Sequence, residues 1–118
     1  MRAKDAVGRY GERVAERYLT ERGWEIVDRN WRGTRGELDL VALDGTTLVV
    51  VEVKTRSGTG FGHPALAVGP AKQATLRRLT GQWLAEHDVR APEVRVDVVC
   101  VLRSPAGPAA IEHLVGIL

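Results

Sequence analysis

The chain has 118 residues, of which 44% are hydrophobic and 27% charged, and its formal net charge is +2. These values predict one domain over residues 1–118 with a real core, and they exclude a disordered chain. There is no run of about 20 apolar residues and no apolar signal core, and cysteine occurs once, so we expect a cytoplasmic protein with no membrane partner.

The first expected element is a helix from Ala3 to Arg22, which Gly23 would end as a C-cap. Apolar residues recur in it at helical spacing, and this periodicity predicts the stripe that faces the core. The residues of this stripe are Ala3, Val7, Tyr10, Val14 and Tyr18.

Two glycines and a carboxylate lie on another side of this helix. Gly8 and Gly11 each cost about 1 kcal/mol relative to alanine, so they predict the close approach of another backbone. That backbone is either the sheet or a bound substrate strand. Glu12 is either a carboxylate beside a metal ion or a surface partner of Arg9 or Arg13.

A first strand is expected from Trp24 to Trp31, followed by a basic turn over residues 33–36. Trp31 has two interpretations. It is a residue of the core or its rim, which is the commoner role of a tryptophan at a strand end, or it stacks on an exposed base. The arginines near it are Arg29, Arg32 and Arg35.

Two apolar runs, residues 36–42 and 48–54, flank the hairpin signal Asp44-Gly45. Each run carries charged residues where a buried strand would hold valine or isoleucine. Side chains of a strand alternate between its faces, so charged residues two positions apart share a face. The two pairs are Glu37 with Asp39 and Glu52 with Lys54.

The register of this hairpin decides whether the two pairs meet. A two-residue turn at Asp44-Gly45 would pair Leu43 with Thr46, whereas a four-residue loop would pair Asp39 with Glu52. Both registers bring all four charged side chains to one face. A slip by one residue would separate them.

Carboxylates that gather on one face repel one another, and a divalent cation relieves that repulsion. Oxygen ligands favour Mg²⁺ or Mn²⁺, with Asp39 and Glu52 as ligands and the Val53 carbonyl as a further one. Lys54 would orient or deprotonate a water molecule, or stabilise transition-state charge, in hydrolysis of a phosphodiester. The alternative is that these are solvated residues, with Glu37 and Lys54 forming an ordinary cross-strand pair.

Residues 53–85 contain basic residues and no acidic one. They predict a basic surface that holds backbone phosphates, or alternatively a solvated helix face. Residues 56–64 are expected to form a flexible glycine-rich loop that closes over substrate. Its His63 either contacts phosphate or is simply exposed.

The second half predicts a helix from Pro70 to about Glu86, a central strand from Val94 to Leu102 and an edge strand from Ile111 to Leu118. The residues expected to be buried on this helix are Leu76, Leu79, Trp83 and Leu84. Asp97 needs a partner such as an arginine and is read as structural, and Cys100 as a small core residue. The predicted order is therefore α-β-β-β-α-β-β, an α/β domain with a mixed sheet.

The pattern of Asp39 followed by Glu52-Val53-Lys54 resembles the core of the PD-(D/E)XK restriction-endonuclease-like superfamily. More closely, the chain resembles the YraN family of small bacterial nuclease-like proteins. The residues that carry this resemblance cover most of the chain and are Gly8-x-x-Gly11-Glu12, Arg29-Asn30-Trp31, Gly36-Glu37-Leu38-Asp39-Leu40, Val51-Glu52-Val53-Lys54-Thr55-Arg56, Phe61-Gly62, Lys72 and Val96-Asp97-Val98-Val99. Leu38 stands where the superfamily pattern has proline.

The resemblance implies a mixed sheet with flanking helices and similarity to Holliday-junction resolvases. It implies that Asp39 and Glu52 bind the metal and that Lys54 is the catalytic lysine. Glu12 then corresponds to the first-helix glutamate of resolvase-like members, and Lys72 lies near the site. A resolvase-like enzyme needs two active sites, hence a homodimer.

The leading hypothesis is a metal-dependent endonuclease that acts on branched or single-stranded DNA. Glu12 and Glu37 would support the site, and five residues would hold backbone phosphates: Arg35, Arg56, Lys72, Arg77 and Arg78. The alternative is a non-catalytic nucleic-acid-binding module that keeps the nuclease fold and acts through a partner. A third possibility is a scaffold with no nucleic-acid role.

Overall fold

The computed structural model describes residues 5–57 and 68–118. It contains the predicted elements in the predicted order: α1 (Ala6–Glu21), β1 (Glu25–Gly33), β2 (Gly36–Asp44), β3 (Thr47–Ser57), α2 (Pro70–Glu86), β4 (Glu93–Arg103) and β5 (Ala110–Leu114). The glycine-rich loop predicted over residues 56–64 begins too early, because Arg56 and Ser57 still pair with β4 as part of β3. The rest of that loop, with His63, lies outside the described residues.

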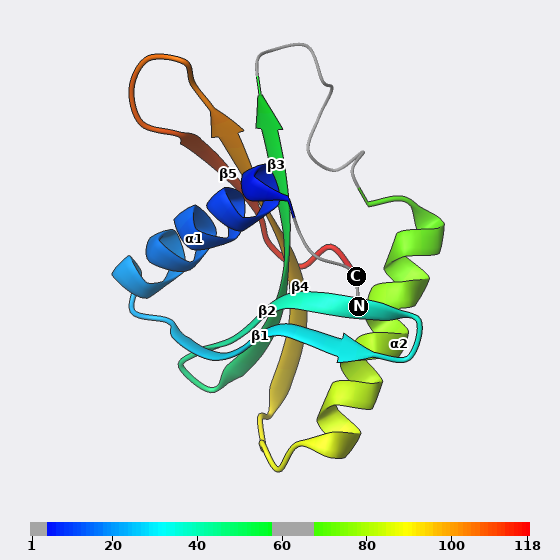
Figure 1. Cartoon of the computed structure of the whole chain (residues 1–118). Coiled ribbons are helices and arrows are strands. Elements are labelled where there is room, and N and C mark those ends of the chain that lie inside the picture. The colour runs from blue at the N-terminus through cyan, green and yellow to red at the C-terminus, as the bar shows by residue number, and fades with distance from the viewer. Residues whose placement is uncertain (1–4, 58–67) are drawn as a thin grey trace.

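The five strands form one mixed sheet in the order β1-β2-β3-β4-β5 (Figure 1). Among the strands of the described residues, β3 and β4 run parallel and the other neighbours are antiparallel. A parallel pair cannot be joined by a tight turn, and here α2 lies in the connection between β3 and β4. The predictions of a mixed sheet and of a central strand at β4 are confirmed. The predicted edge strand is β5, but it ends at Leu114 and not at Leu118, because Gly116 adopts φ 67° and its N–H donates to Asp97.

The β2–β3 hairpin has the register that the four-residue alternative predicts. Leu43 pairs with Leu48, so the pairing of Leu43 with Thr46 is wrong. The reason is that Gly45, with φ 61°, takes the first position of the turn, so Asp44 remains paired with Thr47. Continued along the strands, this register places Asp39 opposite Glu52.

Helix α1 begins at Ala6, so the predicted start at Ala3 is wrong. Asp5 has extended backbone and its carboxylate accepts a hydrogen bond from the Gly8 N–H at 2.7 Å, which makes it the N-cap. At the other end Gly23 adopts φ 89°, and the N–H groups of residues 23 and 24 donate to the carbonyls of residues 20 and 19. The predicted glycine stop is therefore a Schellman motif.

The buried stripe of α1 differs from the predicted one. The buried residues are Gly11, Ala15 and Leu19, while the predicted tyrosines and Val14 flank them and Val7 is 37% exposed. A Cβ built on Gly11 would lie 1.7 Å from Thr55 Oγ1 on β3. Small residues thus let the helix backbone approach the sheet, which explains why the larger apolar residues are displaced to its sides.

The two helices cover opposite faces of the sheet (Figure 1). One buried cluster includes α2 residues and the other includes α1 residues, so the sheet contributes to two cores. The buried residues of α2 include the predicted Leu76, Leu79 and Trp83. Trp31 packs against the α2-side cluster, as the core-rim interpretation predicts.

Asp97 on β4 is completely buried and has several partners. It accepts hydrogen bonds from the Arg95 guanidinium at 2.8 Å, from His113 Nε2 at 2.8 Å and from the Gly116 N–H at 2.9 Å. These bonds lower the pKa of Asp97 although its burial acts in the opposite direction. The predicted arginine partner is confirmed, and the network ties the chain after β5 to the sheet.

Cys100 is a free, buried cysteine, as predicted. Neither described helix is both long enough and apolar enough to cross a membrane.

Candidate active site

The site is built where β2 stops pairing with β3. The pairing described for these strands ends at Leu40 with Val51, whereas β3 remains paired with β4 as far as Ser57. At the preceding position of β2, the Asp39 carboxylate accepts the Val53 N–H at 2.9 Å. A side-chain oxygen therefore satisfies a strand donor, and the Asp39 carboxylate is held against β3.

A break in strand alternation accompanies this change. Leu38 belongs to the α2-side cluster and Leu40 to the α1-side cluster, although residues two apart on a regular strand share a face. On the neighbouring strand, Asn30 adopts φ 48°, in the left-handed region that non-glycine residues rarely occupy. Asp39 lies at this irregularity and is only 6% exposed.

Glu52 is the second carboxylate of the site, and its side chain is 13% exposed. Its pKa is raised to about 7, first because burial disfavours the charged form and then because Asp39 is negatively charged and hydrogen-bonds to it. Lys72 on α2 opposes this effect, with its Nζ 3.1 Å from Glu52 Oε2. The fold therefore holds two carboxyl groups together with one cation beside them.

These groups line an open cleft of about 500 Å³ between the sheet and α2. Lys54 also lines it and is exposed on β3, two residues from Glu52. The residues predicted for the site that line this cleft are Arg35, Glu37, Asp39, Glu52, Val53, Lys54 and Lys72. The tertiary structure thus brings together residues of β2, β3, α2 and the β1–β2 turn.

The donor set of the cleft matches one type of metal ion. Within residues 5–57 and 68–118, no three His, Cys, Asp or Glu side chains gather at a point where they could hold a metal. Tetrahedral zinc with its nitrogen and sulfur ligands does not fit the cleft. Mg²⁺ and Mn²⁺ fit it, because they take one or two carboxylates and complete their shell with water and substrate phosphate.

Glu12 lies outside this cleft. It lines a separate hollow between α1 and β1, where it accepts a hydrogen bond from Asn30 Nδ2 at 2.7 Å. The same amide nitrogen is 3.5 Å from the Asp39 carbonyl oxygen. Glu12 therefore reaches the backbone of Asp39 through Asn30 rather than joining the other carboxylates.

The predicted phosphate-binding residues do not form one surface. Arg78 donates to the carbonyls of Thr34 and Arg35, and so it holds the β1–β2 turn against α2. Arg77 lines a different pocket, with residues of β4 and the C-terminal segment. Arg56 lies farther along β3, near Cys100. Burial raises the pKa of the Cys100 thiol, and the charge of Arg56 opposes that effect.

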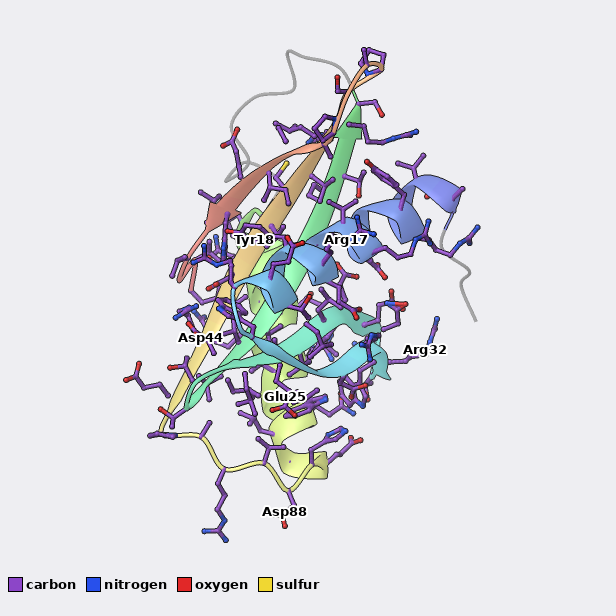
Figure 2. The ribbon with its side chains drawn as sticks, turned by 90° about the vertical axis from the view of Figure 1, so that its left-hand side faces the viewer. Arg17, Tyr18, Glu25, Arg32, Asp44 and Asp88 are labelled. Atoms are coloured by element: carbon purple, nitrogen blue, oxygen red, sulfur yellow. The ribbon has the colours of Figure 1, made fainter. Side chains whose placement is uncertain are left out.

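Three residues that line the cleft were not among the predicted site residues: Arg32, Gly36 and Thr75. Arg32 lies next to the β1–β2 turn (Figure 2). It pairs with Glu37, with Arg32 Nη2 4.0 Å from Glu37 Oε2. Recognition of a two-residue turn over residues 34–35 could have found it, because such a turn places Arg32 opposite Glu37. Nothing local marks Thr75, which enters the cleft through the packing of α2.

Comparisons with known proteins agree on one family. The profile of the uncharacterised protein family UPF0102 matches residues 11–101. UPF0102 proteins from Beutenbergia cavernae and Arthrobacter sp. (strain FB24) are 65% and 55% identical over 117 residues, and one from Streptomyces griseus subsp. griseus is 49% identical over 118. Each alignment covers 99% of both chains. The family description states no activity.

Proposed function

The chain belongs to the uncharacterised protein family UPF0102, and we propose that it is a metal-dependent endonuclease that hydrolyses phosphodiester bonds in DNA. One observation carries the proposal. Asp39 and Glu52 are held together at the wall of a cleft, and the pKa of Glu52 is raised to about 7 by burial and by this neighbour. A divalent cation would relieve the repulsion between the two carboxylates, and a phosphodiester would supply further oxygen ligands to that ion.

Asp39 and Glu52 are the proposed ligands of Mg²⁺ or Mn²⁺, with the Val53 carbonyl as a third. When bound, such an ion supplies Lewis-acid activation of the phosphate and of a water molecule. The protein's own residues hold these ligands in place. The Val53 N–H fixes the Asp39 carboxylate, and Glu37 adds a further negative group to the same cleft.

Two lysines have different proposed roles. Lys54 is exposed on the cleft wall, where it can orient the attacking water or donate to a phosphate oxygen as negative charge develops. Lys72 compensates the charge of Glu52 at 3.1 Å, and once that carboxylate serves as a ligand its ammonium can contact the phosphate.

The cleft also offers cations for the phosphates that flank the scissile bond. Arg32 and Arg35 line it from the β1–β2 turn, which Arg78 anchors to α2 through backbone carbonyls. Contacts to phosphates position a nucleic acid without reading its sequence. The resemblance to the PD-(D/E)XK superfamily supports this assignment of roles.

The test is cleavage of labelled single-stranded, duplex, flapped and four-way-junction DNA with Mg²⁺, Mn²⁺ or EDTA. We expect metal-dependent cleavage that Asp39→Asn and Lys54→Ala abolish. Asp88→Asn serves as the matched control, because Asp88 is an exposed carboxylate far from α1 and the β1–β2 turn (Figure 2). No cleavage of any substrate, or equal cleavage by all variants, would contradict the proposal.

A second candidate is a DNA-binding module that does not hydrolyse its ligand. It is favoured by the cations that line the cleft, Arg32, Arg35 and Lys54, which can contact backbone phosphates without a metal ion. It predicts binding that persists in EDTA and in Lys54→Ala, with an affinity that falls as salt rises. Binding without cleavage under every metal condition would select this candidate.

A further inference from the structure

A second basic surface lies on α1, the helix that covers the other face of the sheet from α2. Arg9, Arg13 and Arg17 are four residues apart and all are exposed. Residues at this spacing lie on one side of a helix, about 6 Å apart along its axis. The result is a row of guanidinium groups whose spacing suits successive phosphates of one nucleic-acid strand.

A groove of about 520 Å³ runs beside this row, between α1 and the β4–β5 hairpin. Tyr10, Val14 and Tyr18 form its helix wall, with Arg13 and Arg17 among its lining residues. The opposite wall comes from Pro108, Ala109 and Ile111. Figure 2 shows Arg17 and Tyr18 on the face of the molecule that carries α1.

More guanidinium groups surround the two tyrosines. Arg103 lies 5.2 Å from the centre of the Tyr10 ring and Arg22 lies 5.3 Å from that of Tyr18. Among the groove's lining residues, Glu21 is the acidic one. Aromatic rings within a positively charged groove are the usual elements of single-strand binding, where rings contact bases and cations contact phosphates.

The groove wall is held in place by a buried network. The Tyr18 hydroxyl is 2.9 Å from His113 Nδ1, and His113 Nε2 is 2.8 Å from Asp97 Oδ2. This chain of hydrogen bonds ties α1 to β5 and to β4. A wall that is already ordered loses little conformational entropy when a ligand binds.

A hollow beside α1 shares a residue with the groove and contacts the edge of the cleft. Arg13 lines both the groove and the hollow that contains Glu12 and Asn30. Asn30 in turn contacts the Asp39 carbonyl, at the edge of the cleft. A strand that leaves the cleft beside Asp39 would pass this hollow and then follow the arginines of α1.

We propose that the arginine row of α1 and its tyrosine-lined groove bind a single-stranded arm of the DNA whose junction occupies the cleft. The inference rests on the proposed function for the place of the junction, but the strand contact itself needs neither metal nor hydrolysis. The expected substrate is therefore duplex DNA that carries a single-stranded arm.

Binding is measured by fluorescence anisotropy with a labelled single-stranded oligonucleotide, in EDTA, at several salt concentrations. We compare the wild type with Arg13→Ala, Arg17→Ala and the double variant. Arg90→Ala is the control, because it removes one charge from an exposed position outside both surfaces. Each of the two α1 substitutions should weaken binding several-fold and reduce the slope of log K against log salt by about 0.7. The control should leave the slope unchanged.

A second comparison uses a flapped duplex and a blunt duplex of the same sequence. The wild type should bind the flapped duplex more tightly, and the double variant should bind both equally. If the α1 variants bind like Arg90→Ala, or keep the preference for the flap, the inference is overturned.

The two proposals can fail separately. Absence of cleavage together with arginine-dependent strand binding would refute the nuclease and support the α1 surface. Cleavage of flapped DNA that is indifferent to Arg13 and Arg17 would support the nuclease and refute the surface. Thermal melting of each variant shows that the fold is intact, and alanine at exposed helix positions favours the helix.

Discussion

Replacement of Glu52 by glutamine should change how the stability of the metal-free protein depends on pH. The pKa of Glu52 is about 7 in the folded chain, against 4.5 for an ordinary glutamate, because of burial and the negative charge of Asp39. The folded state therefore holds this proton more tightly than the unfolded state does. The stability that the protonated Glu52 contributes to the fold is fully present below pH 4.5 and is lost as the pH rises through about 7.

The size of this loss follows from the two pKa values. A difference between 4.5 and about 7 corresponds to about 3 kcal/mol. The pKa of about 7 already includes the opposing effect of Lys72, so no separate deduction for that ion pair is needed. Glutamine has no titrating proton, and the free energy of unfolding of Glu52→Gln should lack this decline.

The assay is urea unfolding of the wild type and of Glu52→Gln at pH 4.5, 6 and 8 in EDTA. Between pH 4.5 and 8 the stability of the variant relative to the wild type should rise by about 3 kcal/mol. Glu25→Gln, at an exposed position of β1, should give a profile parallel to the wild type (Figure 2). A difference between Glu52→Gln and wild type that stays constant with pH would refute the reasoning.

The same experiment at pH 8 also tests the metal site. Mg²⁺ or Mn²⁺ should raise the stability of the wild type, because a ligand that binds only the folded state stabilises it. The increase should be much smaller in Glu52→Gln, which offers a neutral amide in place of the carboxylate. Equal stabilisation of both proteins would place the cation elsewhere.

Three further substitutions test the packing and the charge balance. Gly11→Ala should destabilise the protein by about 1–3 kcal/mol in urea unfolding, because the new Cβ would overlap Thr55; Gly81→Ala, where no atom lies within 4 Å of a new Cβ, should stabilise it by up to about 1 kcal/mol. Equal effects of the two would contradict the close approach of α1 to β3. Lys72→Ala should raise the pKa of Glu52 further by removing its opposing cation, as followed by NMR of the carboxyl carbon, and an unchanged pKa would show that the ion pair is not formed in solution.

Much of the fold is determined by local signals in the sequence. Pro70 marks the first turn of α2, and Gly23 allows the left-handed residue that ends α1. The alternation of apolar residues predicts the strands and the burial of β4. These features depend on residues within about four positions of one another, so a single sequence is sufficient to reveal them.

The hairpin illustrates where local signals stop. The residues Asp44-Gly45 predict a turn, but two registers remained open until the conformation of Gly45 placed Asp44 in the pairing with Thr47. The motif that contains Asp39 and Glu52 is visible in the sequence. The register places them opposite each other, but β2 pairs with β3 only from Leu40 onward, and the Asp39 carboxylate instead accepts the Val53 N–H. Sequence spacing does not encode that change.

The charged residues show the same division. Composition and spacing reveal the basic stretch that follows β3, but only the packing of α2 decides that Lys72 reaches Glu52, that Arg78 holds a turn and that Arg77 faces another pocket. Likewise, the arginine row of α1 is a local pattern, whereas its groove requires the β4–β5 hairpin from the other end of the chain. A residue's helical or strand neighbours follow from backbone periodicity, but its partners across the molecule depend on how distant elements pack together.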